Sequence, residues 1–140
     1  MTYAALTGWG KCLPPAILTN ADLGTFLPTD DAWITSRTGM KERRISHVSG
    51  LEMSYVAASR ALACAGIKAE ELDFIIYGSC STDEHVPNSA SGLQVKLGAH
   101  RAAAMDVNTA CTSFLYGMST ATAFIKSGAA KKVLVVGVEH

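Results

Sequence analysis

The sequence predicts an α/β layered fold built on a mixed, mostly parallel sheet. Two uninterrupted apolar runs, residues 73–78 and 132–138, have the length of strands that are covered on both faces. Helix-forming stretches alternate with such strands, which is typical of parallel strands joined by right-handed crossovers. Ligands of open α/β sheets bind beyond the carboxyl ends of the strands, so a functional site is expected there.

The N-terminal third is expected to hold one strand and two short helices. Residues 3–7 are apolar enough for a first strand. Asn20 is a preferred N-cap for a helix over residues 21–27, because its side chain can accept a hydrogen bond from the helix start. Acidic residues supply a second cap, for a helix over residues 32–37 that ends at Gly39.

A charged segment and a longer helix follow. Residues 41–47 are expected to be exposed, with Ile45 as their anchor. Residues 51–65 carry apolar side chains at the spacing of one helix face and end at Gly66. Cys64 of this helix is expected to lie in the core.

The rest of the chain repeats strands and helices. A helix is expected over residues 88–97, a short buried strand over 102–107 and a long helix over 112–127. The long helix has little polar face, so layers are expected to cover it on two sides. The chain stops directly after the strand at 132–138, and we interpret it as a fragment that lacks one covering layer.

The composition, 49% hydrophobic and only 17% charged, is rich in apolar residues for a self-contained domain, so a partner is expected. Twelve basic residues balance twelve acidic ones, so neither nucleic-acid nor membrane binding is expected. The four cysteines are widely spaced and lack the CxxC or Cys/His clusters of a zinc site. No segment reaches the roughly 20 apolar residues of a membrane span and no secretory leader is visible, so a cytoplasmic location is expected.

Cys111 lies where the strand at 102–107 passes into the helix at 112–127. A helix start offers unpaired N–H groups and the positive end of the helix dipole, and both favour the nucleophilic thiolate. The small residues around Cys111 leave room for a long substrate. On position alone, the alternative is a small core residue, as free cysteines commonly are.

Two long motifs resemble those of the β-ketoacyl-acyl carrier protein synthase III family. Residues 33–45, WITSRTGMKERRI, resemble its signature W-I-x-x-R-T-G-(I/M)-x-E-R-x-I, and residues 106–114, DVNTACTSF, resemble the segment around its nucleophilic cysteine. Residues 19–23 and 126–137 are also similar, so the resemblance covers nearly the whole chain. The resemblance identifies Cys111 as the nucleophile.

The resemblance implies a thiolase-like layered fold, of which residues 1–140 would be the incomplete N-terminal half, and a homodimer. It implies that Cys111 takes an acyl group from acyl-CoA and condenses it with malonyl-acyl carrier protein by decarboxylation, which starts fatty-acid synthesis. No cofactor or metal is implied. An acyl-enzyme divides one difficult bond formation into two easier steps, and the Cys111 N–H is placed to donate to the thioester oxyanion.

By motif match, the resemblance implies that Trp33 lines the CoA entrance, that Arg37 lies near the CoA phosphates and that Thr29 touches the nucleotide. An indole offers a flat face to a base, and a guanidinium pairs with phosphate. A spacing of four places Trp33 and Arg37 on one face of a short helix. The alternative from the residues alone is a buried tryptophan anchoring a loop and an arginine in a surface ion pair.

Two departures from the family are visible. The His and Asn with which the family promotes decarboxylation match no position here, so we expect that this chain cannot complete condensation by itself. The four histidines are expected at the surface. Val86 stands where several relatives have an aromatic residue that closes the partner's acyl pocket, which implies an acyl preference beyond acetyl. The alternative is that the loop simply packs differently.

Other functions are left open by the sequence. Quinolone-forming, polyketide-priming and hydroxymethylglutaryl-CoA synthase relatives share the segment around the cysteine. A non-catalytic subunit that only dimerises or binds acyl-CoA is a further reading. A thiol–disulfide oxidoreductase is least favoured, because Cys111 has no resolving cysteine nearby in the sequence.

Overall fold

The computed structural model describes residues 3–139, and the chain divides into two compact units. Unit 1 takes in Met1–Cys12 and Val48–His140, and unit 2 takes in Leu13–His47. Unit 1 holds a parallel sheet with helices on both faces, whereas unit 2 holds a two-stranded hairpin and two short helices. The predicted α/β class is confirmed.

The core of unit 1 is a three-stranded parallel sheet in the order β4-β3-β5. The central strand β3 (Phe74–Gly78) pairs with β4 (Ala103–Val107) on one side and β5 (Val133–Gly137) on the other. Ile75 and Ile76 of β3 are fully buried, one on each face. The continuous apolar runs therefore predicted these strands correctly, because both faces of the central strand are covered.

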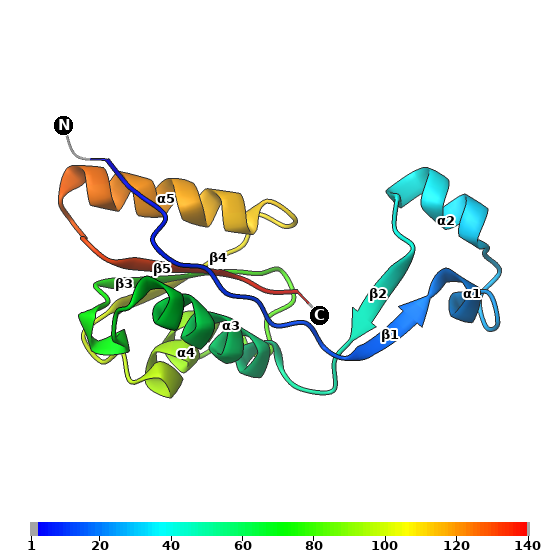
Figure 1. The fold of residues 1–140 in the computed structure, drawn as a ribbon, viewed down its shortest axis with the longest axis horizontal. Coiled ribbons are helices and arrows are strands. Elements are labelled where there is room, and N and C mark those ends of the chain that lie inside the picture. Colours follow the sequence, from blue (N-terminus) through cyan, green and yellow to red (C-terminus); the bar gives the residue numbers. More distant parts are fainter. Residues whose placement is uncertain (1–2, 140) are drawn as a thin grey trace. The chain divides into compact units, whose positions relative to one another are not determined.

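Three helices cover the sheet of unit 1. α5 (Ser113–Ser127) lies on one face, and α3 (Gly50–Ala65) and α4 (Ser89–Leu97) lie on the other (Figure 1). A 3₁₀ turn, η1 (Ala69–Glu71), leads from α3 into β3. Each of the three helices ends at a glycine with positive φ, a left-handed conformation that costs glycine little, at positions 66, 98 and 128.

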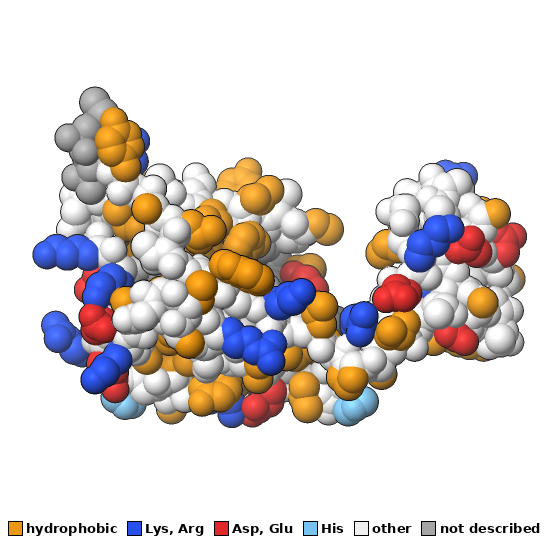
Figure 2. Space-filling model, in the orientation of Figure 1, with side chains coloured by type: hydrophobic (Ala, Val, Ile, Leu, Met, Phe, Trp, Pro, Cys, Tyr) orange, Lys and Arg blue, Asp and Glu red, His pale blue; other side chains and the backbone are white. Residues whose placement is uncertain are grey.

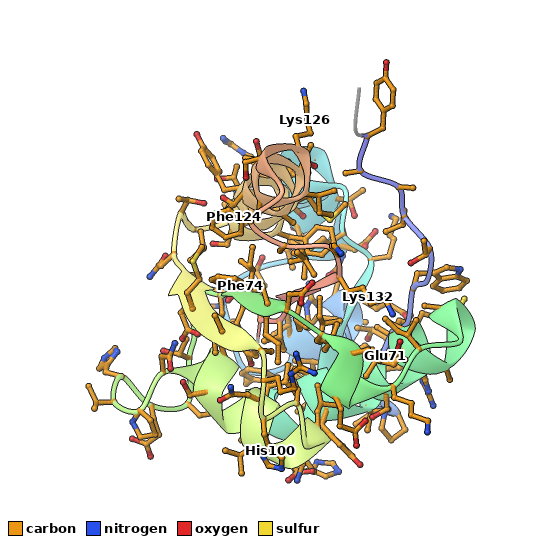
Figure 3. The ribbon with its side chains drawn as sticks, turned by 90° about the vertical axis from the view of Figure 1, so that its left-hand side faces the viewer. Glu71, Phe74, His100, Phe124, Lys126 and Lys132 are labelled. Atoms are coloured by element: carbon orange, nitrogen blue, oxygen red, sulfur yellow. The ribbon has the colours of Figure 1, made fainter. Side chains whose placement is uncertain are left out.

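Two contacts hold the sheet of unit 1 together at the end where its strands begin (Figure 3). The ring of Phe74 on β3 lies 4.9 Å from the ring of Phe124 on α5, measured between centroids. Lys132, which precedes β5, forms an ion pair with Glu71 of η1. These contacts fix α5 and β5 against the central strand at the end where the strands begin.

The N-terminal residues 3–12 are extended but form no described strand, so the predicted first strand over residues 3–7 is wrong. Their backbone instead packs on α3. A Cβ on Gly8 would lie 2.4 Å from the carbonyl oxygen of Ala61, and one on Gly10 would lie 2.2 Å from that of Ala57. Contact between a glycine backbone and a helix holds this segment, and apolar composition does not distinguish such a segment from a paired strand.

Unit 2 is built on an antiparallel hairpin that the sequence analysis did not predict. β1 (Ala16–Thr19) pairs with β2 (Glu42–Ile45). Each strand has only four residues, and β2 is largely charged, so neither shows a clear alternation of apolar and polar residues. The charged segment is mostly exposed as predicted, but Ile45 is itself 43% exposed, and its expected anchoring role is wrong.

The first helix of unit 2, α1 (Asn20–Leu23), is shorter than predicted and has a different cap. The hydroxyl of Thr19 accepts a hydrogen bond from the N–H of Asp22 at 3.1 Å, and the Asp22 carboxylate accepts one from the N–H of Thr19 at 2.8 Å. Thr19, not Asn20, is therefore the N-cap. Asn20 is buried, and its side-chain amide donates to Asp31 at 2.8 Å.

The structure also bears on the burial predicted for the two long helices, and the prediction for Cys64 is wrong. Cys64 of α3 is exposed, because it lies on the side of the helix that faces away from the sheet. One face of α5 packs on the sheet, and Phe114, Leu115 and Tyr116 are exposed, so the expected cover on the second side stays a prediction. Figure 2 shows hydrophobic side chains on the visible surface of unit 1, over α5 and β5. No helix within residues 3–139 combines the length and hydropathy needed to cross a bilayer.

Candidate functional site

Cys111 lies in the loop between β4 and α5, just before the helix starts. The N–H of Thr112 donates to the carbonyl of Thr109 at 3.3 Å, and the N–H of Ser113 donates to the carbonyl of Ala110 at 3.0 Å. The hydroxyl of Ser113 also donates to Ala110 at 2.7 Å and accepts from the N–H of Thr109 at 3.0 Å. The buried Ser113 thus fixes the turn that presents Cys111.

The turn holds Cys111 outward at some backbone cost. Ala110 has a φ of 52°, a left-handed conformation that non-glycine residues rarely adopt. Such strain persists where the surrounding contacts over-determine the conformation, and it concentrates at functional sites. The thiol of Cys111 is exposed, so the alternative of a small core residue is wrong.

Cys111 lines a largely apolar cavity of about 690 Å³ in unit 1. The walls come from the N-terminal segment, from α3 and α5, and from β5 with the two residues after it. Cavities of this size commonly bind small molecules, with apolar walls and a few polar groups that set the ligand's orientation. Cys111 and Glu139 are among the few groups in this wall that can react or hydrogen-bond.

The carboxyl ends of β3 and β5 lie against the start of α5. The sequence analysis expected a site at this end of the strands. A Cβ on Gly78, the last residue of β3, would lie 2.9 Å from the carbonyl carbon of Ser113. A Cβ on Gly137, the last residue of β5, would lie 3.0 Å from the ring of Phe114. The residues that follow these two glycines therefore belong to the same edge of unit 1 as Cys111.

Glu139 and Cys80 belong to this edge, and the sequence analysis did not single them out. The Glu139 carboxylate accepts hydrogen bonds from the N–H of Cys80 at 3.0 Å, from the Cys80 thiol at 3.4 Å and from the Ser81 hydroxyl at 2.6 Å. Both residues follow the end of a strand by two positions. The rule that sites form at the carboxyl ends of strands is the signal that could have found them.

These contacts shift the pKa of both groups. Partial burial raises the pKa of Glu139, but hydrogen bonds from Ser81 and Cys80 outweigh it, and the net pKa of Glu139 is below its ordinary value. The hydrogen bond to Glu139 is the main cause that raises the pKa of Cys80, and burial, the charge of Glu139 and, least, that of Cys111 add to the rise. The Cys80 thiol is thus held in its protonated form.

Trp33 and Arg37 lie on α2 (Asp31–Thr38) in unit 2, and Thr29 precedes that helix. Trp33 is 58% exposed, so the alternative of a buried anchor is wrong. The Arg37 guanidinium lies 5.8 Å from the centroid of the Trp33 ring, so the spacing of four does place both on one face. The hydroxyl oxygen of Thr29 is buried and has no hydrogen-bond partner among the described residues.

Val86 lies in the loop between β3 and α4, and its side chain is 87% exposed. The predicted surface positions of His47, His85 and His100 are confirmed, whereas His140 lies outside the described residues. Within residues 3–139, no three His, Cys, Asp or Glu side chains gather as metal ligands would.

The chain is similar to known condensing enzymes. A family model described as thiolase, N-terminal domain, matches residues 34–140. β-Ketoacyl-[acyl-carrier-protein] synthase III 2 of Vibrio cholerae serotype O1 is 55% identical over 138 residues, which are 99% of this chain and 38% of that protein. This confirms the resemblance expected from the two motifs.

Solved structures agree in fold. The 3-oxoacyl-[acyl-carrier-protein] synthase III of Aquifex aeolicus VF5 superposes with a TM-score of 0.92 at 42% identity, over 99% of this chain and 45% of that one. The priming β-ketosynthase of the R1128 polyketide biosynthetic pathway superposes with a TM-score of 0.93 at 29% identity, over 99% of this chain and 42% of that one. The chain thus spans less than half the length of these relatives, and the predicted layered fold is confirmed.

Proposed function

Because the chain belongs to the thiolase family through its N-terminal domain, we propose that Cys111 accepts an acyl group from acyl-CoA for condensation with malonyl-acyl carrier protein. The observation that carries this proposal is the exposed Cys111 at the start of α5, in the wall of an apolar cavity. The relatives named β-ketoacyl-[acyl-carrier-protein] synthase III support the reaction class.

The acyl transfer uses groups that this chain presents. The Cys111 thiolate attacks the thioester carbonyl carbon, a new carbon–sulfur bond forms, and the bond to the CoA sulfur breaks. CoA leaves as a thiolate that takes a proton from solvent. The backbone N–H of Cys111 is our proposed donor to the oxyanion of the intermediate. The apolar cavity accommodates the acyl chain, at roughly 25 cal/mol per Å² of apolar surface removed from water.

We assign the capture of CoA to α2. The exposed indole of Trp33 offers a face for stacking the adenine, and the guanidinium of Arg37 offers paired N–H donors to phosphate. Thr29, at the start of the same segment, is our third candidate for nucleotide contact. The stacked arrangement of Arg37 on Trp33 supports a shared role, because it orders two long side chains before the ligand arrives.

The second step, condensation, involves two proposed partners, an acyl carrier protein and a second copy of the chain. Acyl carrier protein delivers the malonyl group, and a homodimer in the cytoplasm is the form expected from the family. Val86 is small and 87% exposed, which supports its proposed place at the acyl pocket of a partner subunit. A preference for acyl groups longer than acetyl follows. Competition between acetyl-CoA and octanoyl-CoA for Cys111 tests it, and strict acetyl selectivity would contradict it.

A second candidate function keeps the nucleophile and changes the product. The similarity to the R1128 priming β-ketosynthase favours the priming of polyketide chains. Both functions share the acyl-enzyme and differ in the carrier that accepts the primer. Turnover with fatty-acid and polyketide acyl carrier proteins, measured side by side, separates the two.

The acyl-enzyme itself is tested by intact mass after incubation with acetyl-, butyryl-, octanoyl- and lauroyl-CoA. We expect a gain equal to one acyl group, absent in Cys111→Ala and retained in Cys64→Ala, whose thiol is exposed on α3. A gain that survives Cys111→Ala contradicts the assignment. Protection of Cys111 from iodoacetamide by acyl-CoA, without any mass gain, would instead identify a non-catalytic acyl-CoA binder.

A further inference from the structure

Unit 1 contains a second thiol, that of Cys80, at the edge of the sheet where Cys111 lies. The proposed acyl transfer does not use it. Cys80 follows β3, whose last residue, Gly78, is packed against Ser113 at the start of α5. Glu139 holds Cys80 by both its N–H and its thiol, and Glu139 lines the same cavity as Cys111. Cys80 and Cys111 are both exposed. Chain folding thus places both cysteines at the edge of unit 1 where β3 and β5 end and α5 begins.

We propose that Cys80 and Cys111 form a reversible disulfide when the protein meets a hydroperoxide. The Cys111 thiolate attacks the distal peroxide oxygen, the O–O bond breaks, and the leaving oxygen takes a proton to give water or an alcohol. Sulfur is oxidised to a sulfenic acid and the peroxide is reduced. The Cys80 sulfur then attacks the Cys111 sulfur, and the sulfenic hydroxyl leaves with the Cys80 proton as water.

The other two cysteines do not fit this role. Cys64 is exposed on α3, which covers the sheet face opposite to α5. Cys12 is half-buried at the end of the extended N-terminal segment. Within residues 3–139, Cys80 is the one cysteine that is tied by a side-chain hydrogen bond to a residue in the cavity wall that contains Cys111. This pairing supplies the resolving thiol that the sequence spacing did not show.

The protonated state of Cys80 suits a resolving cysteine that rests in the reduced form. A thiol attacks far more slowly than a thiolate, so Cys80 waits until Cys111 has become electrophilic. The disulfide would remove the nucleophile of the proposed acyl transfer and shield it from irreversible oxidation to sulfinic acid. Reduction by a dithiol would restore it.

The test uses the Cys12→Ser/Cys64→Ser double variant, which keeps only the two thiols concerned. After one equivalent of hydrogen peroxide at low protein concentration, we expect the loss of two hydrogens in the intact mass. A tryptic digest without reductant should link the peptide of residues 69–96 to that of residues 102–126. Dithiothreitol should separate them.

Cys80→Ser in the same background is the matched control. Without a resolving thiol, the Cys111 sulfenic acid should persist, and dimedone should trap at least tenfold more of it than in the parent. Equal trapping, dimers linked between two chains, or no oxidation of Cys111 would each overturn the proposal. The unoxidised proteins are also tested for acylation by acyl-CoA, so failure of the disulfide is distinguished from failure of the proposed function.

Discussion

Gly78 and Ser113 are in closer contact than any side chain at position 78 would allow. A Cβ on Gly78 would lie 2.9 Å from the carbonyl carbon of Ser113 and 3.1 Å from the nitrogen of Phe114. Both are backbone atoms that cannot rotate away. The end of the central strand therefore determines where α5 begins, and with it the position of Cys111.

Gly78→Ala should push the first turn of α5 away from β3. We expect the free energy of unfolding in guanidinium chloride to fall by about 1–3 kcal/mol, the usual cost of overpacking. The rate at which iodoacetamide alkylates Cys111 should change in the same variant. Gly92→Ala is the control, because its Cβ would meet only the flexible side chain of Leu51, at 3.3 Å. Equal stabilities of the two variants would contradict this account.

The left-handed Ala110 next to Cys111 gives a second prediction. A non-glycine residue in this conformation costs about 1–2 kcal/mol, and glycine loses about 0.5–1 kcal/mol more chain entropy than alanine. Ala110→Gly should therefore stabilise the protein by up to about 1 kcal/mol, whereas the β-branched Ala110→Val should destabilise it. Thermal unfolding of the three proteins checks the order. A destabilised Ala110→Gly would show that Ala110 carries no strain.

The elements that the sequence predicted well are those with local signals. β3 and β5 are continuous apolar runs, and the glycines after α3 and α4 end those helices in the left-handed conformation. The hairpin of unit 2 was missed because β1 and β2 gain their strand structure from pairing across more than twenty residues. The strand predicted over residues 3–7 is wrong because an apolar segment forms a strand only where another strand pairs with it.

The candidate site likewise contains residues that the local sequence could predict and residues that only the fold brings together. Cys111 could be predicted, because a cysteine between a strand and a helix is a local pattern and the motif around it is specific. Glu139 and Cys80 could not, because 59 residues separate them and only the parallel pairing of β3 with β5 brings them together. Sequence reasoning singled out the proposed nucleophile and missed Glu139 and Cys80 at the same edge of unit 1.

The hydrogen-bonded carboxylate of Asp73 predicts that the protein becomes less stable at acid pH. Its carboxylate accepts hydrogen bonds from the N–H groups of Lys131 and Lys132 at 2.7 and 2.9 Å, and these bonds lower the pKa of Asp73 below its ordinary value. A lowered folded-state pKa contributes stability above the ordinary pKa of aspartate, and this contribution is lost as the pH falls through the folded-state value. Asp73→Asn should therefore lower the melting temperature at pH 7 and have less effect near pH 2. An equal loss at both pH values would rule out the ionised carboxylate as the cause.

The exposed pair on α2 gives the last prediction. If Arg37 pairs with phosphate and Trp33 stacks the adenine, Arg37→Gln and Trp33→Ala should each raise the acyl-CoA concentration that half-saturates Cys111 acylation by about tenfold, or about 1.4 kcal/mol. The effect of Arg37→Gln should shrink as salt screens its charge, whereas that of Trp33→Ala should not. Lys126→Gln, which removes an exposed cation from the far end of α5, is the control.

The contact between Arg37 and Trp33 predicts that the effects of the two substitutions are not additive. Because Arg37 rests on the Trp33 ring, the double variant should lose less than the sum of the single losses, by about 0.5–1 kcal/mol, the worth of an exposed cation–π pair. Additive losses would mean that the ligand meets the two side chains independently. Unchanged half-saturation in both single variants would remove α2 from the CoA site and leave the acyl-enzyme at Cys111 to be explained by another route of capture.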